Sequence, residues 1–127
     1  MPVTDPVADM LARLRNGHQA LHADVEIPLS RMKADLARIL KEEGFVEDYK
    51  VGEYTISIKL KYVDGRPLIA GARKVSTPGR RVYVGVNEIP RVRNGLGICV
   101  LSTSRGVMEG SRASSENVGG ELLCEIW

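Results

Sequence analysis

The chain has 127 residues, 43% of them hydrophobic and 27% charged, which suits one medium-sized or two small folded domains and excludes a disordered chain. No run approaches the roughly 20 apolar residues of a membrane span, and residues 1–9 lack the basic and apolar regions of a signal peptide, so we expect a cytoplasmic protein with no membrane partner. The net charge is only +2, but residues 66–115 hold nine Lys or Arg against two Asp or Glu, which favours a polyanion ligand and a solvated basic face about equally.

The first predicted element is a helix that begins at Pro6. Asp5 suits the capping position and Pro6 the first helical position. Asn16-Gly17 suggests that this helix ends there. The apolar residues recur at i, i+3, i+4 and i+7 and predict one buried stripe: Val7, Met10, Leu11 and Leu14.

A second helix of about 13 residues is expected between a Ser30 cap and Gly44 at its C-terminal end. Its predicted buried face consists of Met32, Leu36, Ile39 and Leu40. Strands are expected over residues 24–27, 45–51, 54–62 and 68–75, the last two joined by an Asp64-Gly65 turn. The first subdomain therefore has the order α-β-α-β-β-β.

Thr77-Pro78-Gly79 is a break, where we place a boundary between residues 1–76 and 77–127. Beyond it we expect strands over residues 81–86, 97–101 and 122–127, with at most a helical turn over 88–93 and a short helix over 111–117. The predicted class is α+β, with an N-terminal mixed subdomain and a C-terminal subdomain that is mostly β.

Neither the histidines nor the cysteines predict a metal site. His18 and His22 are four residues apart but lack an intervening Glu and a third ligand close in sequence, which favours loop histidines. Cys99 and Cys124 are too few for a disulfide framework, lack metal-site spacing and lie in strand-like runs, which favours buried free thiols.

Ser102-Thr103-Ser104-Arg105-Gly106 is the stretch that most suggests a binding site. Successive hydroxyls, with a glycine that allows close approach, suit phosphate oxygens, sugar hydroxyls and exposed base edges of RNA. Without context, such a stretch is more often an ordinary turn. A nucleophilic serine here would need a base, and both histidines are far away in sequence.

A second cationic stretch, Pro78-Gly79-Arg80-Arg81-Val82-Tyr83, adds two guanidiniums and an aromatic ring. Arginine pairs with phosphate and stacks on bases, and tyrosine offers a stacking face with a hydroxyl. A half-buried strand tyrosine beside surface arginines is an equally open alternative.

Taken together, the chain resembles the bacterial small-subunit ribosomal protein eight family (the S-eight family) nearly from end to end. The shared blocks, in chain order, are residues 5–11 (DPVADML) with Arg13, Arg15 and Asn16; Ile27, Pro28, Ser30 and Lys33; residues 39–45 (ILKEEGF); 78–83 (PGRRVY); Ile89 and Pro90; 94–98 (NGLGI); 101–108 (LSTSRGVM); 117–121 (NVGGE); and Trp127.

The resemblance implies a non-enzymatic protein, a monomer within the ribosome, that binds the central domain of small-subunit ribosomal RNA early in assembly and contacts neighbouring ribosomal proteins. It implies no cofactor and no metal. In several bacteria such proteins also bind the messenger of their own operon through a similar site.

Carried over to this chain, the resemblance implies a main RNA contact in the C-terminal half and a second one in the N-terminal half. Arg80 and Arg81 are added to the main contact from their own chemistry. The main contact comprises Ser102, Thr103, Ser104, Arg105, Gly106 and Tyr83, with Arg80 and Arg81. The second comprises Arg13, Arg15, Asn16, Ser30 and Lys33.

This chain also departs from the family pattern. Thr77 and Arg105 stand where lysine is usual, and residues 109–116 lack the basic helix that is common before Gly119-Gly120, which puts contacts around Arg112 in doubt. Two alternatives belong to other functional classes: a protein-interaction module with a basic face, and a hydrolase or transferase that uses Ser102 or Ser104.

Overall fold

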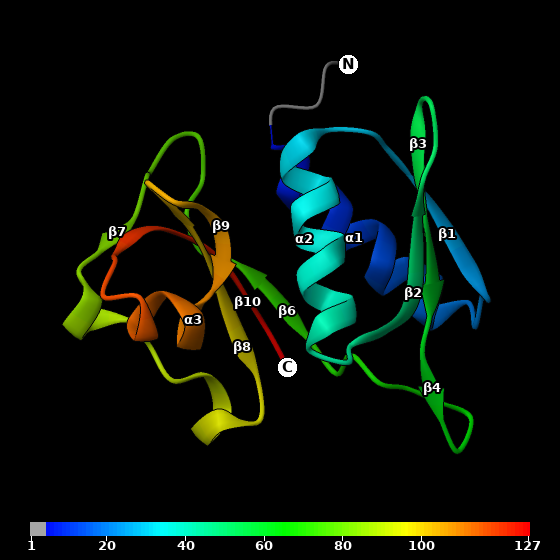
Figure 1. Cartoon of the computed structure of the whole chain (residues 1–127). Coiled ribbons are helices and arrows are strands. Elements are labelled where there is room, and N and C mark those ends of the chain that lie inside the picture. Colours follow the sequence, from blue (N-terminus) through cyan, green and yellow to red (C-terminus); the bar gives the residue numbers. More distant parts are fainter. Residues whose placement is uncertain (1–4) are drawn as a thin grey trace. The chain divides into compact units, whose positions relative to one another are not determined.

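The computed structural model describes residues 5–127; residues 1–4, part of the segment in which no signal peptide is expected, lie outside the described range. The chain forms two compact units, an N-terminal unit of Pro6–Ala70 and a C-terminal unit of Gly71–Trp127 to which Asp5 belongs (Figure 1). Helices and antiparallel sheets give an α+β architecture, as predicted. The division falls after Ala70, whereas the sequence suggested Ser76, because residues 72–74 pair with the last strand of the chain.

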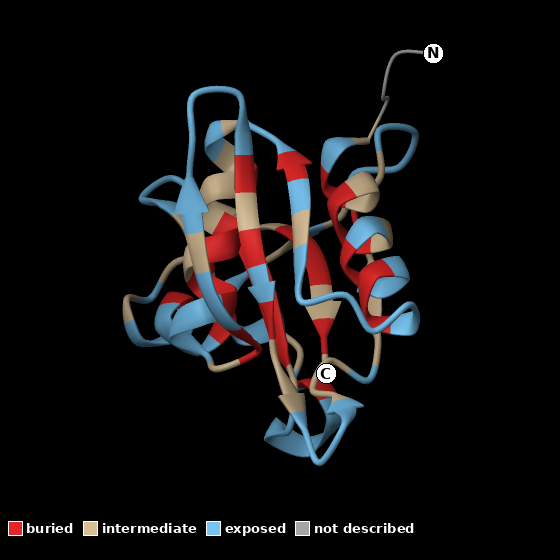
Figure 2. Cartoon of the chain, turned by 90° about the vertical axis from the view of Figure 1, so that its right-hand side faces the viewer, coloured by how far each residue is buried: buried red, intermediate tan, exposed pale blue. Residues whose placement is uncertain are grey.

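In the N-terminal unit, α1 (Pro6–Gln19) and α2 (Arg31–Glu42) pack on a three-stranded antiparallel sheet. The sheet has the order β1 (Asp24–Pro28), β3 (Thr55–Leu60), β2 (Val46–Val51). Both helices lie against the same side of this sheet (Figure 1). Along β3, buried residues alternate with exposed or partly buried ones (Figure 2). Ile56, Ile58 and Leu60 therefore face the core.

The helix signals of the sequence are confirmed in detail. Val7, Met10, Leu11 and Leu14 are all buried. The Ser30 hydroxyl accepts a hydrogen bond from the Lys33 amide at 3.2 Å. Gly44 has a φ of +81°, and the amide of Phe45 donates to the carbonyl of Leu40, which satisfies the end of α2.

Two predictions for the helices were wrong. α1 does not end at Gly17 but continues to Gln19. Gly17 is instead a packing position, since a Cβ there would lie 2.5 Å from Cγ1 of Val25 in β1. In α2 the buried face includes Lys33 and Ala37, whereas Met32 is only partly buried.

The predicted returning strand over residues 68–75 was also wrong. Asp64 and Gly65 form the expected turn, with φ of +53° and +76°, but the hairpin contains only β4 (Tyr62–Val63) and β5 (Arg66–Pro67). Residues Ala72–Lys74 form β6, which pairs with the C-terminal strand β10 (Gly120–Ile126). Pro67 in β5 has no amide hydrogen, so it cannot donate a hydrogen bond that would extend the pairing of β4 and β5.

The sheet of the C-terminal unit is larger than the sequence indicated. It has the order β6–β10–β8–β9, where β8 is Ile98–Thr103 and β9 is Gly106–Glu109, and the short β7 (Tyr83–Val84) also pairs with β10. Two 3-10 turns, η1 (Val86–Glu88) and η2 (Val92–Gly95), lead into β8, and α3 (Gly110–Ser115) follows β9. Buried residues from these elements form one core cluster: Val92, Cys99, Leu101, Met108, Ala113 and Leu122.

Cys99 and Cys124 are buried free thiols, as predicted. Burial raises the pKa of Cys99 to about 11 and that of Cys124 to about 12.

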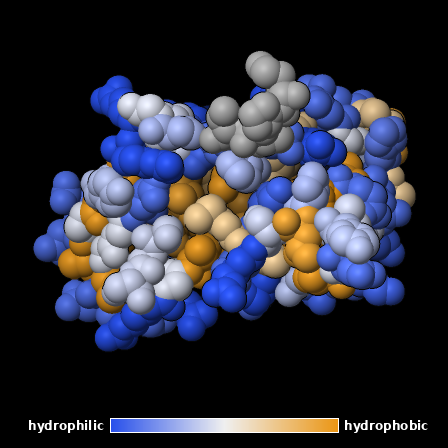
Figure 3. All heavy atoms as spheres, turned by 90° about the horizontal axis from the view of Figure 1, so that it is seen from above, coloured by the Kyte–Doolittle hydropathy of each residue, from blue (hydrophilic) through white to orange (hydrophobic). Residues whose placement is uncertain are grey.

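No helix among residues 5–127 is long and apolar enough to cross a membrane. On the face seen in Figure 3, hydrophilic side chains surround smaller apolar areas.

His18 should make folding of the N-terminal unit depend on pH. It lies in α1 rather than in a loop, is 3% exposed, and neither ring nitrogen has a hydrogen-bond partner among the described residues. Its neighbour is the ring of Tyr62, at 5.3 Å between centroids. Burial lowers the pKa of His18 from its ordinary value of 6.5.

Because burial lowers the pKa of His18 in the folded state, the unfolded chain takes up the proton first as the pH falls through 6.5. We therefore expect the free energy of unfolding, measured in urea, to be highest above pH 6.5 and to fall toward pH 5.5. His18→Leu should flatten this dependence. An identical pH dependence in the variant would contradict the assignment to His18.

Candidate nucleic-acid interface

The hydroxyl-rich stretch forms the tip of a β-hairpin. Ser102 and Thr103 end β8, Ser104 and Arg105 make a two-residue turn, and Gly106 begins β9 opposite Thr103. We call residues 102–106 the hydroxyl hairpin. Gly106 has a φ of +110°, a left-handed conformation that favours glycine. The glycine in this stretch is therefore required by the turn itself.

The three hydroxyls have different roles. Oγ1 of Thr103 donates to the carbonyl of Gly106 at 2.8 Å and accepts from the amide of Arg105 at 3.1 Å, so it holds the turn together. The hydroxyls of Ser102 and Ser104 have no hydrogen-bond partner among residues 5–127. A rigid turn therefore presents two hydroxyls that are available to a ligand.

Tyr83 and Ser102 lie in one row across the sheet. Glu121 in the central strand β10 is directly opposite Tyr83 of β7 on one side and Ser102 of β8 on the other. Directly opposite residues in a sheet point to the same face. Tyr83 is 70% exposed. The aromatic ring of Tyr83, the carboxylate of Glu121 and the hydroxyl of Ser102 are thus presented side by side, where the hydroxyl hairpin begins.

Glu121 was not predicted as a site residue. Its carboxylate accepts hydrogen bonds from the Ser76 hydroxyl at 2.5 Å and from Arg81 at 3.1 Å. The Ser76 hydroxyl, which is fully buried, also accepts from the amide of Val82 at 3.1 Å. These partners are separated by up to 45 residues, so no local sequence pattern could reveal them.

A close approach of β10 to β8 supports this row. A Cβ at Gly120 would lie 2.2 Å from the carbonyl oxygen of Ser102 and 3.0 Å from its carbonyl carbon. The two strands therefore require a glycine at this position. Gly120 sets the backbone position of Ser102, from which the hydroxyl hairpin extends.

Several arginines of the basic block, residues 66–115, are paired with carboxylates, so the block is less strongly positive than its number of Lys and Arg residues suggests. The three glutamates that follow it, Glu116, Glu121 and Glu125, each pair with an arginine of the block: Arg105 and Arg112, Arg81, and Arg73 respectively. Arg80 has no such partner among the described residues and is exposed, in a turn closed by hydrogen bonds between the backbones of Thr77 and Arg80. Arg80 is therefore better placed than Arg81 to attract a polyanion.

The five site residues predicted in the N-terminal unit lie on its two helices. Arg13, Arg15 and Asn16 are exposed on α1, and Arg13 pairs with Asp9 at 2.9 Å. Ser30 and Lys33 are at the start of α2, where the Ser30 hydroxyl caps the helix and Lys33 is only 6% exposed. The structure thus leaves Arg15 and Asn16 more accessible than Ser30 and Lys33.

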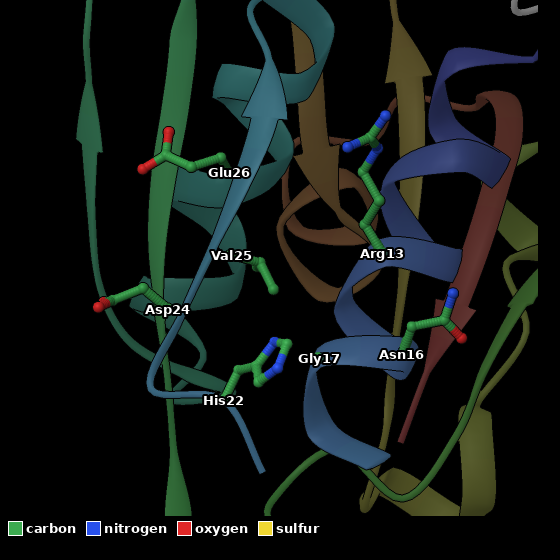
Figure 4. Close-up of a pocket in the computed structure, with 7 residues that line it drawn as sticks. All are labelled: Arg13, Asn16, Gly17, His22, Asp24, Val25 and Glu26. Carbon is green, nitrogen blue, oxygen red and sulfur yellow. The ribbon is translucent and has the colours of Figure 1, made fainter. Parts of the chain in front are cut away.

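A shallow hollow of about 290 Å³ between α1 and β1 includes Arg13 and Asn16 in its lining. Figure 4 shows that the side chains of His22 and Val25 point toward α1, whereas those of Asp24 and Glu26 point to the other side of the strand. Its polar groups do not converge, so the hollow lacks the arrangement of a small-molecule site. Among residues 5–127 there is no group of three potential metal-ligating side chains.

Nor does the hydroxyl hairpin have the arrangement of a catalytic serine. Neither Ser102 nor Ser104 is hydrogen-bonded to a base within the described part of the chain, and both histidines belong to the N-terminal unit. The arrangement suits recognition by hydrogen bonds and stacking.

Comparison with known proteins relates the whole described chain to one family. The sequence pattern of the family described as Ribosomal protein S8 matches residues 5–127. The chain is 62% identical over 125 residues to "Small ribosomal subunit protein uS8" of Desulfovibrio desulfuricans, covering 98% of this chain and 99% of that protein. Proteins of the same name are 54% identical in Roseiflexus castenholzii, with full coverage of both chains, and 52% identical in Lawsonia intracellularis, with 98% and 99% coverage.

Proposed function

The chain belongs to the ribosomal protein S8 family, whose members are structural proteins without enzymatic activity, and from this premise we propose that it binds small-subunit ribosomal RNA through its hydroxyl hairpin. It acts as a structural component of the small subunit in the cytoplasmic ribosome. Its ligand is the central domain of the RNA, to which it binds directly and early in assembly.

One observation carries this proposal: two unpartnered hydroxyls, those of Ser102 and Ser104, on a turn that is braced from within by Thr103. Because the turn is already fixed, a ligand need not order it on binding. Exposed Tyr83, in the same row as Ser102, adds a face on which a base can stack.

The site divides attraction from recognition. Arginines such as Arg80 attract phosphates whatever the sequence, while the hydroxyls and Tyr83 recognise one RNA shape. The bases of a regular RNA helix are hidden in its deep major groove, so the recognised segment should be an irregular helix. If about five phosphates are neutralised, log K should fall with log salt at a slope of about −4.

The N-terminal unit provides a second contact in this proposal. The exposed Arg15 and Asn16 on α1, with Arg13, would meet the RNA backbone. Ser30 and Lys33 contribute less. The Ser30 hydroxyl is already hydrogen-bonded as the cap of α2, and Lys33 is buried. Neighbouring small-subunit proteins complete its partners. The messenger of its own operon, implied by the resemblance, would bind through the same hairpin.

Two substitutions separate attraction from recognition. Ser104→Ala should weaken binding to a central-domain RNA fragment by about three- to tenfold, the effect of one lost hydrogen bond, and leave binding to a random RNA unchanged. Arg80→Ala should weaken both RNAs and flatten the salt slope by about 1. Filter binding at several salt concentrations measures both effects.

Equal losses on cognate and random RNA for Ser104→Ala would contradict this division. A basic interaction module for an acidic protein would bind neither RNA preferentially. The same pair of RNAs therefore also tests that alternative, and an operon messenger fragment can be added as a third ligand.

A further inference from the structure

Beside the hydroxyl hairpin, one carboxylate holds two arginines. Oε1 of Glu116 lies 3.5 Å from Nη1 of Arg105, and Oε2 lies 2.7 Å from Nε of Arg112. Arg105 is next to Ser104 in the turn, so this carboxylate sits against the part of the protein that we propose meets RNA. Both guanidinium side chains are 61% exposed, while Glu116 is 30% exposed.

The short helix α3 creates this arrangement. Glu109 caps its start by accepting from the amides of Ser111 and Arg112, and Glu116 ends it by donating its amide to the carbonyl of Arg112. Arg112 and Glu116 are therefore one turn apart on the same side. The side chain of Glu116 takes no part in capping, so it can be changed without removing a helix cap.

Glu116 is ionised at neutral pH. The hydrogen bond from Arg112, and the attraction of Arg112 and Arg105, lower the pKa of its carboxyl. A phosphate that approaches Arg105 must therefore compete with a carboxylate that is already in place.

We propose that Glu116 is a specificity-determining residue that weakens the attraction of the hydroxyl hairpin for arbitrary RNA by occupying Arg105 and Arg112. The inference rests on the proposed function, because it assumes that RNA binds at this hairpin. Binding to arbitrary RNA is essentially electrostatic. Because Glu116 neutralises part of the charge of Arg105 and Arg112, it lowers the affinity for such RNA directly. Among the described residues, the hydroxyls of Ser102 and Ser104 make no hydrogen bond to Glu116, so they keep their role in recognition.

Arg105 and Arg112 are exposed, so their ion pairs with Glu116 can change the affinity for RNA only by a few-fold. Replacing Glu116 by glutamine keeps the shape of the side chain and removes its charge. Glu116→Gln should tighten binding to random single-stranded RNA by about two- to fivefold at low salt. The salt slope for that RNA should steepen by about 1, since one more phosphate contact forms. The ratio of cognate to random affinity should fall by about twofold or more.

Glu42→Gln is the matched control. Glu42 is the last residue of α2 and pairs with Arg38 four residues earlier, as Glu116 pairs with Arg112, so both variants remove one charge from an i,i+4 pair at a helix end. We expect Glu42→Gln to leave binding to random RNA unchanged. If Glu116→Gln tightens binding to random RNA by releasing Arg105, the double variant Glu116→Gln, Arg105→Ala should not show this tighter binding.

Filter binding of the full-length protein to the random RNA and to the central-domain fragment decides the question, with circular dichroism to confirm that each variant is folded. Unchanged binding of Glu116→Gln to random RNA, an equal gain for Glu42→Gln, or an equal gain on the cognate fragment would overturn the inference. If the unmodified protein fails to bind the central-domain fragment, the proposed function itself is wrong, which is a different result.

Discussion

Leu101→Ala is expected to lower the free energy of unfolding by about 2–5 kcal/mol, the usual cost of a cavity left by a buried leucine. Leu101 is fully buried in β8 and packs in the core cluster with Met108 and Leu122, its neighbours across the sheet. A loss of this size is a large part of the roughly 5–15 kcal/mol that stabilises a typical domain. Urea unfolding followed by circular dichroism measures it.

Leu96→Ala provides the matched control for this substitution. Leu96 is 85% exposed, just after η2 in the same unit, so the same truncation there should change the free energy of unfolding by less than about 0.5 kcal/mol. Similar losses for Leu96→Ala and Leu101→Ala would show that the core of the C-terminal unit is not where the structure places it.

Gly120→Ala should damage both the fold and the RNA site. The added Cβ would lie 2.2 Å from the Ser102 carbonyl, and both atoms belong to paired strands, so β8 or β10 must shift. Overpacking of this kind costs about 1–3 kcal/mol of stability. The shift also displaces Ser102 from its row with Tyr83, so we expect at least about a tenfold loss of affinity for the central-domain fragment.

Gly79→Ala serves as the comparison, because a Cβ at Gly79 meets nothing within 4 Å. It should bind the fragment as the unmodified protein does. A folded Gly120→Ala protein with normal affinity for the cognate RNA would mean that the spacing of β8 and β10 does not matter for binding.

The features predicted correctly are those encoded by neighbouring residues. The stripe of α1, the Ser30 cap and the Gly44 stop depend on contacts within one or two helical turns, so their spacing is visible in the sequence. The hydroxyl hairpin was likewise recognisable as a hydroxyl-rich turn. Its second strand, β9, escaped prediction because it has four residues and runs directly into α3.

The features that were missed depend on distant pairing. β6 leaves the predicted hairpin to pair with β10, which lies some 50 residues later and has no sequence signal for this choice. Gly17 looked like a helix stop but is a contact point for Val25. Glu116 and Glu121 follow the basic block that was counted, so the sequence revealed its arginines without the carboxylates that neutralise them.

Chemical footprinting on naked small-subunit ribosomal RNA tests the central claim most directly. We predict that the protein protects a short, irregular helix in the central domain at low ionic strength, and that Ser104→Ala needs about three- to tenfold more protein to give the same protection. An absence of confined protection, or protection by Ser104→Ala at the same protein concentrations as the unmodified protein, would contradict the claim that the hydroxyl hairpin recognises this RNA.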